Sequence, residues 1–337
     1  MPADAPITLR LVRCSIRHAL AWLIVAVLTP ALALAFAFGA WNIHLQAAAT
    51  DQGLQNTARA LSLAIDRDVG SILSALTTLA SSPYLDSHEF RRFHEQALAA
   101  TLPFGGWVVL TDRVGQQVVN TKRSFGDPLP TASAPDTIAR VFRDARPVVS
   151  DRVYGKVAAD EIVFVAVPVF RDGIVVYCVD MAFTTGRFSE LLAEHELPDR
   201  WFASLIDDAG VRIARSLDAE RFADRPPPLW FVEGTRGRTD GLLQGHGNAG
   251  YDIRVAFHRS RFTGWTAAIA APMAVMTEAR DRLLFTAAAG SLACMAFAFA
   301  IGMIAERKIS AMVQSWSGQR IAATRSVYRG WRTSRGS

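Results

Sequence analysis

The side chains that could catalyse a reaction or hold a metal are scattered along the chain. The sequence contains no G-x-S-x-G, H-E-x-x-H or C-x-x-C motif and no Gly-rich phosphate loop. His88 and His94 are six residues apart, so on a helix they would not share the face that a metal site needs. Glu194, His195 and Glu196 are typical of a solvated helix end. We therefore expect no enzyme, no cofactor and no metal site.

A different chemistry is indicated by polar side chains in apolar surroundings. Asp180 ends a strand-like run of apolar residues, where a carboxylate without a partner is costly to bury. Asn120, Arg152, Tyr154 and Tyr177 could face the same concavity. These five residues predict a pocket for a small amine-bearing or polar ligand. The ordinary alternatives are a core role for Tyr177, a surface charge for Arg152 and a strand-end cap for Asp180.

Two long apolar runs indicate that the protein is anchored in a membrane. Residues 19–40 and 283–304 each form 22 residues without a charge, which exceeds the roughly 20 needed to cross a bilayer. Trp22 and Trp41 bracket the first run, as interfacial aromatics do. Residues 35–37 resemble a signal-peptide cleavage site, but the run is longer than a signal h-region. We expect a retained anchor, with cleavage as the alternative.

The charge distribution orients these two spans. Residues 1–18 and 305–337 together carry 10 basic and 2 acidic residues, and the remaining residues carry 26 basic and 29 acidic ones. Short basic segments beside apolar spans are typical of the cytoplasmic side. We therefore expect a two-pass protein of the bacterial inner membrane, with both termini in the cytoplasm and residues 41–282 outside. Because the basic excess belongs to the tails, we expect no nucleic-acid partner; RNA or lipid binding by the tails is the alternative.

The three cysteines form no disulfide framework. Cys14 precedes the first run, Cys294 lies within the second, and only Cys178 lies between them. The middle segment therefore cannot form an internal disulfide. Cys178 has apolar neighbours and is expected to be a small buried residue.

A long helix is predicted directly after the first span. From Gln46 to Ala80 the sequence lacks proline, and its apolar residues recur every three or four positions. Ser82-Pro83 should end this helix, and a shorter helix with Asp86 or Ser87 as N-cap should follow. We expect part of the apolar stripe to pack on its own domain and the exposed remainder to pack on a second copy in a parallel homodimer. The stripe consists of Leu54, Ala58, Leu61, Ile65, Val69, Ile72, Leu76 and Leu79.

The middle segment contains an internal repeat. Trp107–Asn120 and Phe202–Arg215 share aromatic, D-x-x-G and apolar positions at an offset of 95 residues. In each, Asp can bond forward to the backbone and Gly supplies a positive φ, which predicts a hairpin. Further strands are expected at 162–170 and 174–181 and at 251–257 and 265–271, with a linking helix around Phe188 to Leu192. Arg236, Arg238 and Asp240 are expected in a solvated loop, as are the prolines at 226–228.

These features together resemble a double Cache domain, the extracytoplasmic sensor of many bacterial histidine kinases and chemoreceptors. The matching elements are the long helix, the helix end at Leu79–Leu85, the paired hairpins, Pro168–Gly173 and the closing Gly264–Pro272. The resemblance implies two PAS-like modules, of which the membrane-distal one binds a small ligand and the proximal one passes the change to the second span. It also implies that Asp180 stands where amine-binding members place an acidic residue.

The sequence departs from that family in two places. About 33 residues follow the second span; Ile309–Val313 looks like the start of a HAMP linker without its proline, and no phospho-acceptor His region or ATP-lid motif follows. A separate cytoplasmic kinase or other output protein would then be a partner, or the receptor is truncated. The Arg-x-Trp-Tyr cluster of amino-acid-binding members is also missing, because no tryptophan lies between Pro130 and Asp180. An amino-acid ligand is therefore not expected.

The predicted fold is α+β, with two transmembrane helices flanking a tandem PAS-like domain. The expected function is a membrane-bound sensor subunit that signals across the inner membrane. The alternatives are a membrane-anchored structural or assembly protein and an extracytoplasmic enzyme. The predicted segments are a basic tail at 1–18, a transmembrane helix at 19–40, a stalk helix at 41–83, a distal module at 84–195, a proximal module at 196–282, a transmembrane helix at 283–304 and a basic tail at 305–337.

Overall fold

The computed structural model describes residues 7–194, 197–223, 225–275, 281–282, 284–297, 299–301 and 303–304. The chain divides into two compact units, one formed by 1–46 with 278–337 and the other by 47–277. Helix α1, Ile7–Ala80, contributes to both units. The candidate sites all lie in the second unit.

The first unit contains helical apolar sequence. Among the residues that the structure describes, the helix over Leu284–Ile301 is long and apolar enough to cross a membrane. The run at 19–40 is helical as part of α1, with Pro30 inside the helix. One such span is found in the described part of the chain, so the two-span arrangement stays a proposal. The Arg-rich tail and the segment at 309–313 lie outside the described residues.

The first module of the second unit, residues 81–194, is built on an antiparallel sheet. The strand order is β2-β1-β6-β5-β3, and β4 also pairs with β5. The predicted hairpin and the predicted long strands are confirmed, whereas α4 and the short strands were not predicted. The strands are β1 Trp107–Asp112, β2 Gln117–Asn120, β3 Val148–Val149, β4 Val153–Gly155, β5 Asp160–Arg171 and β6 Ile174–Thr184. The helices are α2 Pro83–Asp86, α3 Phe90–Thr101, α4 Pro135–Asp144 and the linking α5 Thr185–Ala193.

The second module, residues 197–275, repeats this plan with five strands. Their order is β8-β7-β11-β10-β9, all antiparallel. The expectation of a solvated loop around Asp240 is wrong, because Asp240 begins an edge strand that pairs with β10 over its whole length. Glycines at 241, 245 and 247 weaken the strand signal in the sequence. The strands are β7 Phe202–Ile206, β8 Arg212–Arg215, β9 Asp240–His246, β10 Asp252–Arg259 and β11 Thr266–Pro272; the helices are α6 Ala219–Phe222 and α7 Leu229–Thr235.

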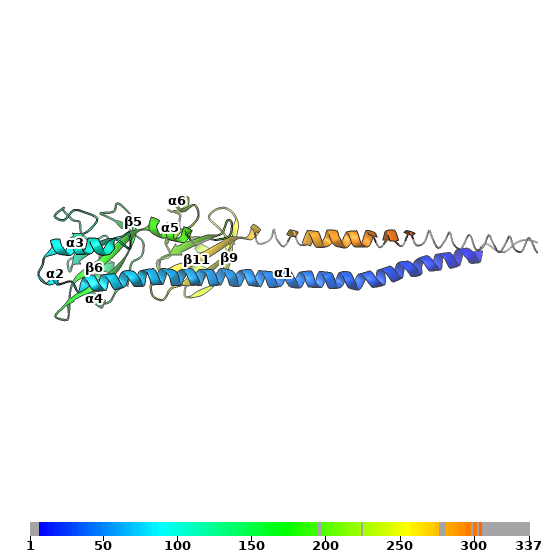
Figure 1. The fold of residues 1–337 in the computed structure, drawn as a ribbon, viewed down its shortest axis with the longest axis horizontal. Coiled ribbons are helices and arrows are strands. Elements are labelled where there is room, and N and C mark those ends of the chain that lie inside the picture. The colour runs from blue at the N-terminus through cyan, green and yellow to red at the C-terminus, as the bar shows by residue number, and fades with distance from the viewer. Residues whose placement is uncertain are drawn as a thin grey trace, which may run out of the picture. The chain divides into compact units, whose positions relative to one another are not determined.

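The apolar stripe of α1 packs on one face of both sheets. From Leu54 to Leu79 all eight stripe residues are at most 2% exposed, and they share one core with β1, β5, β6, β7 and β11. Figure 1 shows this part of α1 running beside both sheets. The expectation of an exposed remainder for a second copy is therefore wrong for these residues, because two modules in tandem cover the full stripe. Arg254 and Asp51 form an ion pair that also ties β10 to α1.

The opposite face of each sheet carries a smaller core. In the first module this core contains Trp107, Phe164 and Cys178, and α4 covers it through Ile138 and Val141. In the second module a core that contains Phe202, Ile206 and Phe257 packs on Phe231 of α7. Cys178 is fully buried, as predicted. Each sheet therefore lies between α1 and a short helix of its own module.

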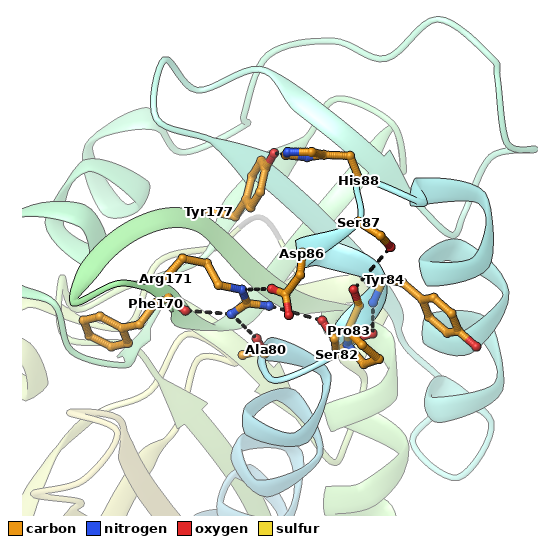
Figure 2. Close-up of polar contacts among 10 residues, drawn as sticks. All are labelled: Ala80, Ser82, Pro83, Tyr84, Asp86, Ser87, His88, Phe170, Arg171 and Tyr177. Atoms are coloured by element: carbon orange, nitrogen blue, oxygen red, sulfur yellow. Dashed lines mark hydrogen bonds and ion pairs between the residues drawn. The ribbon is translucent and has the colours of Figure 1, made fainter.

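The end of α1 is held by a side chain from the β5–β6 hairpin. Arg171 donates from Nη1 to the carbonyl of Ala80 (3.2 Å) and from Nη2 to that of Ser82 (3.1 Å), and it pairs with Asp86 through Nε (Figure 2). The bond to Ala80 satisfies a carbonyl in the last turn of α1, where the helix itself supplies no donor. Ser82-Pro83 follows the helix end, as predicted. The predicted N-cap of the next helix is wrong: Pro83 starts the separate turn α2, so α3 begins after Glu89.

Candidate functional site

A small cavity lies on the α4 side of the first sheet. It has a volume of about 30 Å³, which is room for about two water molecules at roughly 10–15 Å³ each. Its floor comes from β1, β2, β5 and β6, and its walls come from 132–134, α4 and 155–158. Any ligand larger than a few atoms must therefore displace part of these walls. The residues that line the cavity include Trp107, Thr111, Gln117, Asn120, Ser133, Gly155 and Asp180.

Asp180 contributes the one charged side chain of this lining. It sits mid-strand in β6, between Val109 of β1 and Ala166 of β5, and it is 5% exposed. It forms no hydrogen bond or ion pair with any residue that the structure describes. Burial raises the pKa of its carboxyl well above the usual aspartate value. The side chain is therefore a buried acid that a cationic group in the cavity could pair with.

Neutral polar groups surround this acid. Asn120 donates through Nδ2 to Oε1 of Gln117 (2.9 Å), and its own Oδ1 accepts from the backbone N–H of Lys122 (3.0 Å). The hydroxyl of Thr111 is buried and has no hydrogen-bond partner among the described residues. A buried hydroxyl without a partner costs free energy. The cavity thus offers an acid, an amide pair and a free hydroxyl to a polar ligand.

Two of the five candidate residues line the cavity and three do not. Asn120 and Asp180 come together on one sheet face. Tyr177 lies on the α1 face of β6, where its hydroxyl is 3.5 Å from Nδ1 of His88 (Figure 2). Its ring packs edge-on against Phe90. Tyr154 is 58% exposed, although Gly155 beside it lines the cavity. The strand period explains this separation, because neighbouring residues face opposite sides.

Arg152 lies at the junction of the two modules. Its guanidinium donates to Glu161 (3.0 Å) and to the carbonyls of Arg212 and Ala223 (both 3.0 Å). Its backbone N–H donates to Oδ2 of Asp207 (2.9 Å), the hairpin aspartate of the second module. Three residues along, Gly155 lines the cavity. Segment 150–156 therefore joins the cavity wall to the second module.

An indole strengthens the same junction. Trp265 Nε1 donates to the carbonyl of Ser150 (3.1 Å), and its ring packs edge-on against Phe188 of α5. Ser150 is itself fixed by accepting the backbone N–H of Phe164 of β5 (2.8 Å). Nothing in the sequence pointed to this role for 150–156, because its partners in the second module lie 55 to 115 residues away. Tertiary contacts alone reveal it.

Comparison with known structures identifies the fold. The chain matches the extracellular domain of rpHK1S-Z16, a protein described as a histidine kinase, with a TM-score of 0.56 and 15% identity over 69% of this chain and 98% of that one. It also matches the ligand-binding domain of the Campylobacter jejuni chemoreceptor Tlp3 with L-valine (TM-score 0.51, 10% identity, 71% and 98%). The chain has the fold of a double Cache sensor domain. No protein-family model and no curated protein matches it in sequence.

Some of the matched domains are described with an amino acid, as Tlp3 is with L-valine. The ligand-binding domain of Mlp24 is described with asparagine, and it matches with a TM-score of 0.50 and 14% identity over 68% of this chain and 95% of that one. At such identities the likeness concerns the fold. Within the residues that the structure describes, no cluster of three or more His, Cys, Asp or Glu could hold a metal. His195 and Glu196 lie outside those residues.

Proposed function

We propose that this double Cache chain is a membrane-anchored sensor subunit whose first module binds a small cationic amine. The observation that carries the proposal is Asp180, a buried carboxylate without a protein partner at a cavity. An ammonium group would offset the cost of burying this charge. Gln117, Asn120 and Thr111 line the same cavity, and we propose that they orient polar atoms of the ligand.

The cavity lining supports an amine rather than an α-amino acid. It contains an acid but no arginine or lysine, so a ligand carboxylate would lack a cationic partner. The sequence lacks the Arg-x-Trp-Tyr cluster that holds a carboxylate in amino-acid-binding members. We infer that the ligand carries a net positive charge.

Signal transfer is proposed to run through segment 150–156. A ligand that displaces the wall at Gly155 would move Arg152 and Ser150, which bond to the second module. That module would then shift the second span, with residues 41–282 outside the membrane and both termini in the cytoplasm. The runs at 19–40 and 283–304 are the proposed spans, and a separate cytoplasmic output protein is the proposed partner.

A parallel homodimer is proposed through the face of α1 that points away from the sheets. Leu63 is 46% exposed there, and Ala60 and Arg67 are also exposed. Leu54, Leu61 and Ile65 are unsuitable interface positions, because their own sheets bury them.

A ligand screen tests the sensor proposal. Thermal unfolding of the full chain in lipid nanodiscs is followed against cationic amines, amino acids, carboxylic acids and sugars. A ligand raises the unfolding midpoint by stabilising the folded state by RT ln(1 + [L]/Kd), and we expect this for cationic amines. A screen without any shift would favour the structural or assembly alternative.

The variant Asp180→Asn tests the site itself. It keeps the shape of the side chain and removes its charge, so an amine found in the screen should bind more weakly by roughly 1.5–3 kcal/mol. Asp127→Asn, an exposed change of the same kind, is the matched control. Unchanged affinity in folded Asp180→Asn protein would remove Asp180 from the site.

A further inference from the structure

The internal repeat places two arginines where the first module has the polar floor of its cavity. At the offset of 95 residues, Gln117 corresponds to Arg212 and Asn120 to Arg215. The strand pairing agrees: Asn120 lies opposite Val109 and Arg215 opposite Ser204, and both hairpins have a bulge at the same step. Both positions face the side of the sheet away from α1.

The charge of this face is reversed between the modules. In the first module, Val109 is flanked by Asn120 and by the acid Asp180. In the second, the equivalent Ser204 is flanked by Arg215 and by Ala268. The acid of the first module is thus replaced by alanine, and its amides are replaced by guanidinium groups.

Both arginines are buried, at 6% and 4% exposure, and most of their contacts are to carbonyls and rings. Arg212 donates from Nη1 to the carbonyls of Phe222 (3.1 Å) and Arg225 (2.5 Å). Arg215 donates from Nε to the carbonyl of Leu217 (2.7 Å). Its guanidinium carbon is 3.6 Å from the ring centre of Phe202 and 4.3 Å from that of Phe222.

No carboxylate of a described residue pairs with either arginine. Nε of Arg212, Nη2 of Arg215 and the hydroxyl of Ser204 are buried without a hydrogen-bond partner in the described part of the chain. Burial lowers the pKa of Arg215 to about 10, against longer-range attraction to Tyr251 and Asp218. Burial and repulsion by Arg215 and Arg152 lower the pKa of Arg212 to about 10, so both arginines remain charged at neutral pH. Two buried cations without an anion are a costly arrangement.

We propose that the second module binds a small oxyanion, a phosphate or carboxylate group, on the N–H groups of Arg212 and Arg215 and the hydroxyl of Ser204. Guanidinium groups present several N–H donors in a planar fork that fits such oxygens. The anion neutralises the two buried charges and satisfies the three free polar atoms. The two modules then bind ligands of opposite charge at equivalent positions.

The test uses the full chain in nanodiscs, with inorganic phosphate and succinate as probes. Calorimetric titration is run against chloride at equal ionic strength, because general salt effects also change stability. We expect saturable binding of at least one probe and a matching rise of the unfolding midpoint. No saturable binding of either probe overturns the proposal.

Variants locate the binding. Arg212→Lys keeps the charge and removes the fork, and Ser204→Ala removes one hydroxyl; each should weaken binding by about tenfold or more, the effect of losing a charge-assisted hydrogen bond. Arg236→Lys, the same change at an exposed position of this module, should bind as the wild type does. If Arg212→Lys fails to fold, the anion affinity of the milder Ser204→Ala variant tests the proposal instead.

Unchanged affinity in both folded variants would show that the arginines only fasten segment 217–225 to the sheet. Asp180→Asn should leave anion binding intact, since the acid lies in the other module. Failure of the anion site would therefore leave the amine proposal unaffected.

Discussion

At the residue scale, the buried charge of Asp180 lowers the stability of the ligand-free protein, and the same charge can bind a cationic ligand. Its pKa is raised by burial, so the folded protein favours the protonated acid. The stability that this proton provides is present below the usual aspartate pKa and is lost as the pH rises through the raised pKa. We expect Asp180→Asn to raise the unfolding midpoint at neutral pH without ligand, and the gain over wild type to vanish in acid. Thermal unfolding across pH measures this.

The same titration acts on the ligand. Protonation of Asp180 removes the partner of an ammonium group, so amine affinity should fall as the pH drops through the raised pKa. Affinity titrations at several pH values check this, with Asp127→Asn as the reference. An affinity that stays constant with pH would argue against an ionised Asp180 in the complex.

At the element scale, the stripe of α1 holds both sheets together. Leu61 of α1 is 2% exposed, and Leu98 of α3 is 47% exposed. Leu61→Ala should lower the free energy of unfolding by about 2–5 kcal/mol because it leaves a cavity. Leu98→Ala should change it by less than about 0.5 kcal/mol. Denaturant unfolding of the two variants makes the comparison, and equal effects would contradict the packing of α1.

Segment 150–156 is the second element with a definite role. Arg152→Gln removes the guanidinium bonds to Glu161, Arg212 and Ala223. It should lower the free energy of unfolding by about 1.5–3 kcal/mol and loosen the coupling of the modules. We therefore expect two unfolding transitions for this variant and one for the wild type. The exposed Arg113→Gln is the control. A single transition of wild-type stability in Arg152→Gln would show that this junction carries no coupling.

At the scale of the whole molecule, topology can be read by labelling. Val114 is 85% exposed in the first hairpin. In a chain whose Cys14 and Cys294 are replaced, Val114→Cys should react with a membrane-impermeant maleimide in intact cells. Ser337→Cys should react only after the cells are opened. The reverse pattern would overturn the two-span arrangement.

Cysteines also test the dimer. Leu63→Cys should crosslink between copies in membranes, whereas the buried Leu61→Cys should not. Crosslinking at neither position in native membranes would argue for a monomer.

The sequence alone determined the long helix, the two hairpins and the long strands of both modules, because each of these signals was local. Periodic apolar residues mark the stripe of α1 and the strands, and turn residues mark the D-x-x-G hairpins. These patterns can be recognised without knowing any contact between distant segments. Asp180 and Asn120 could also be predicted as site residues, because each is a polar residue in an apolar strand pattern. The edge strand at 240–246 was missed because glycines hide its period.

Only the tertiary structure decided which residues meet. Register placed Asp180 and Asn120 on one face and Tyr177 on the other, since a side chain's face depends on strand pairing. The burial of the whole stripe followed from two sheets stacked along one helix. The roles of Arg152, Arg212 and Arg215 depend on partners that are contacts of the folded chain, and a sequence pattern records composition and spacing but not those contacts.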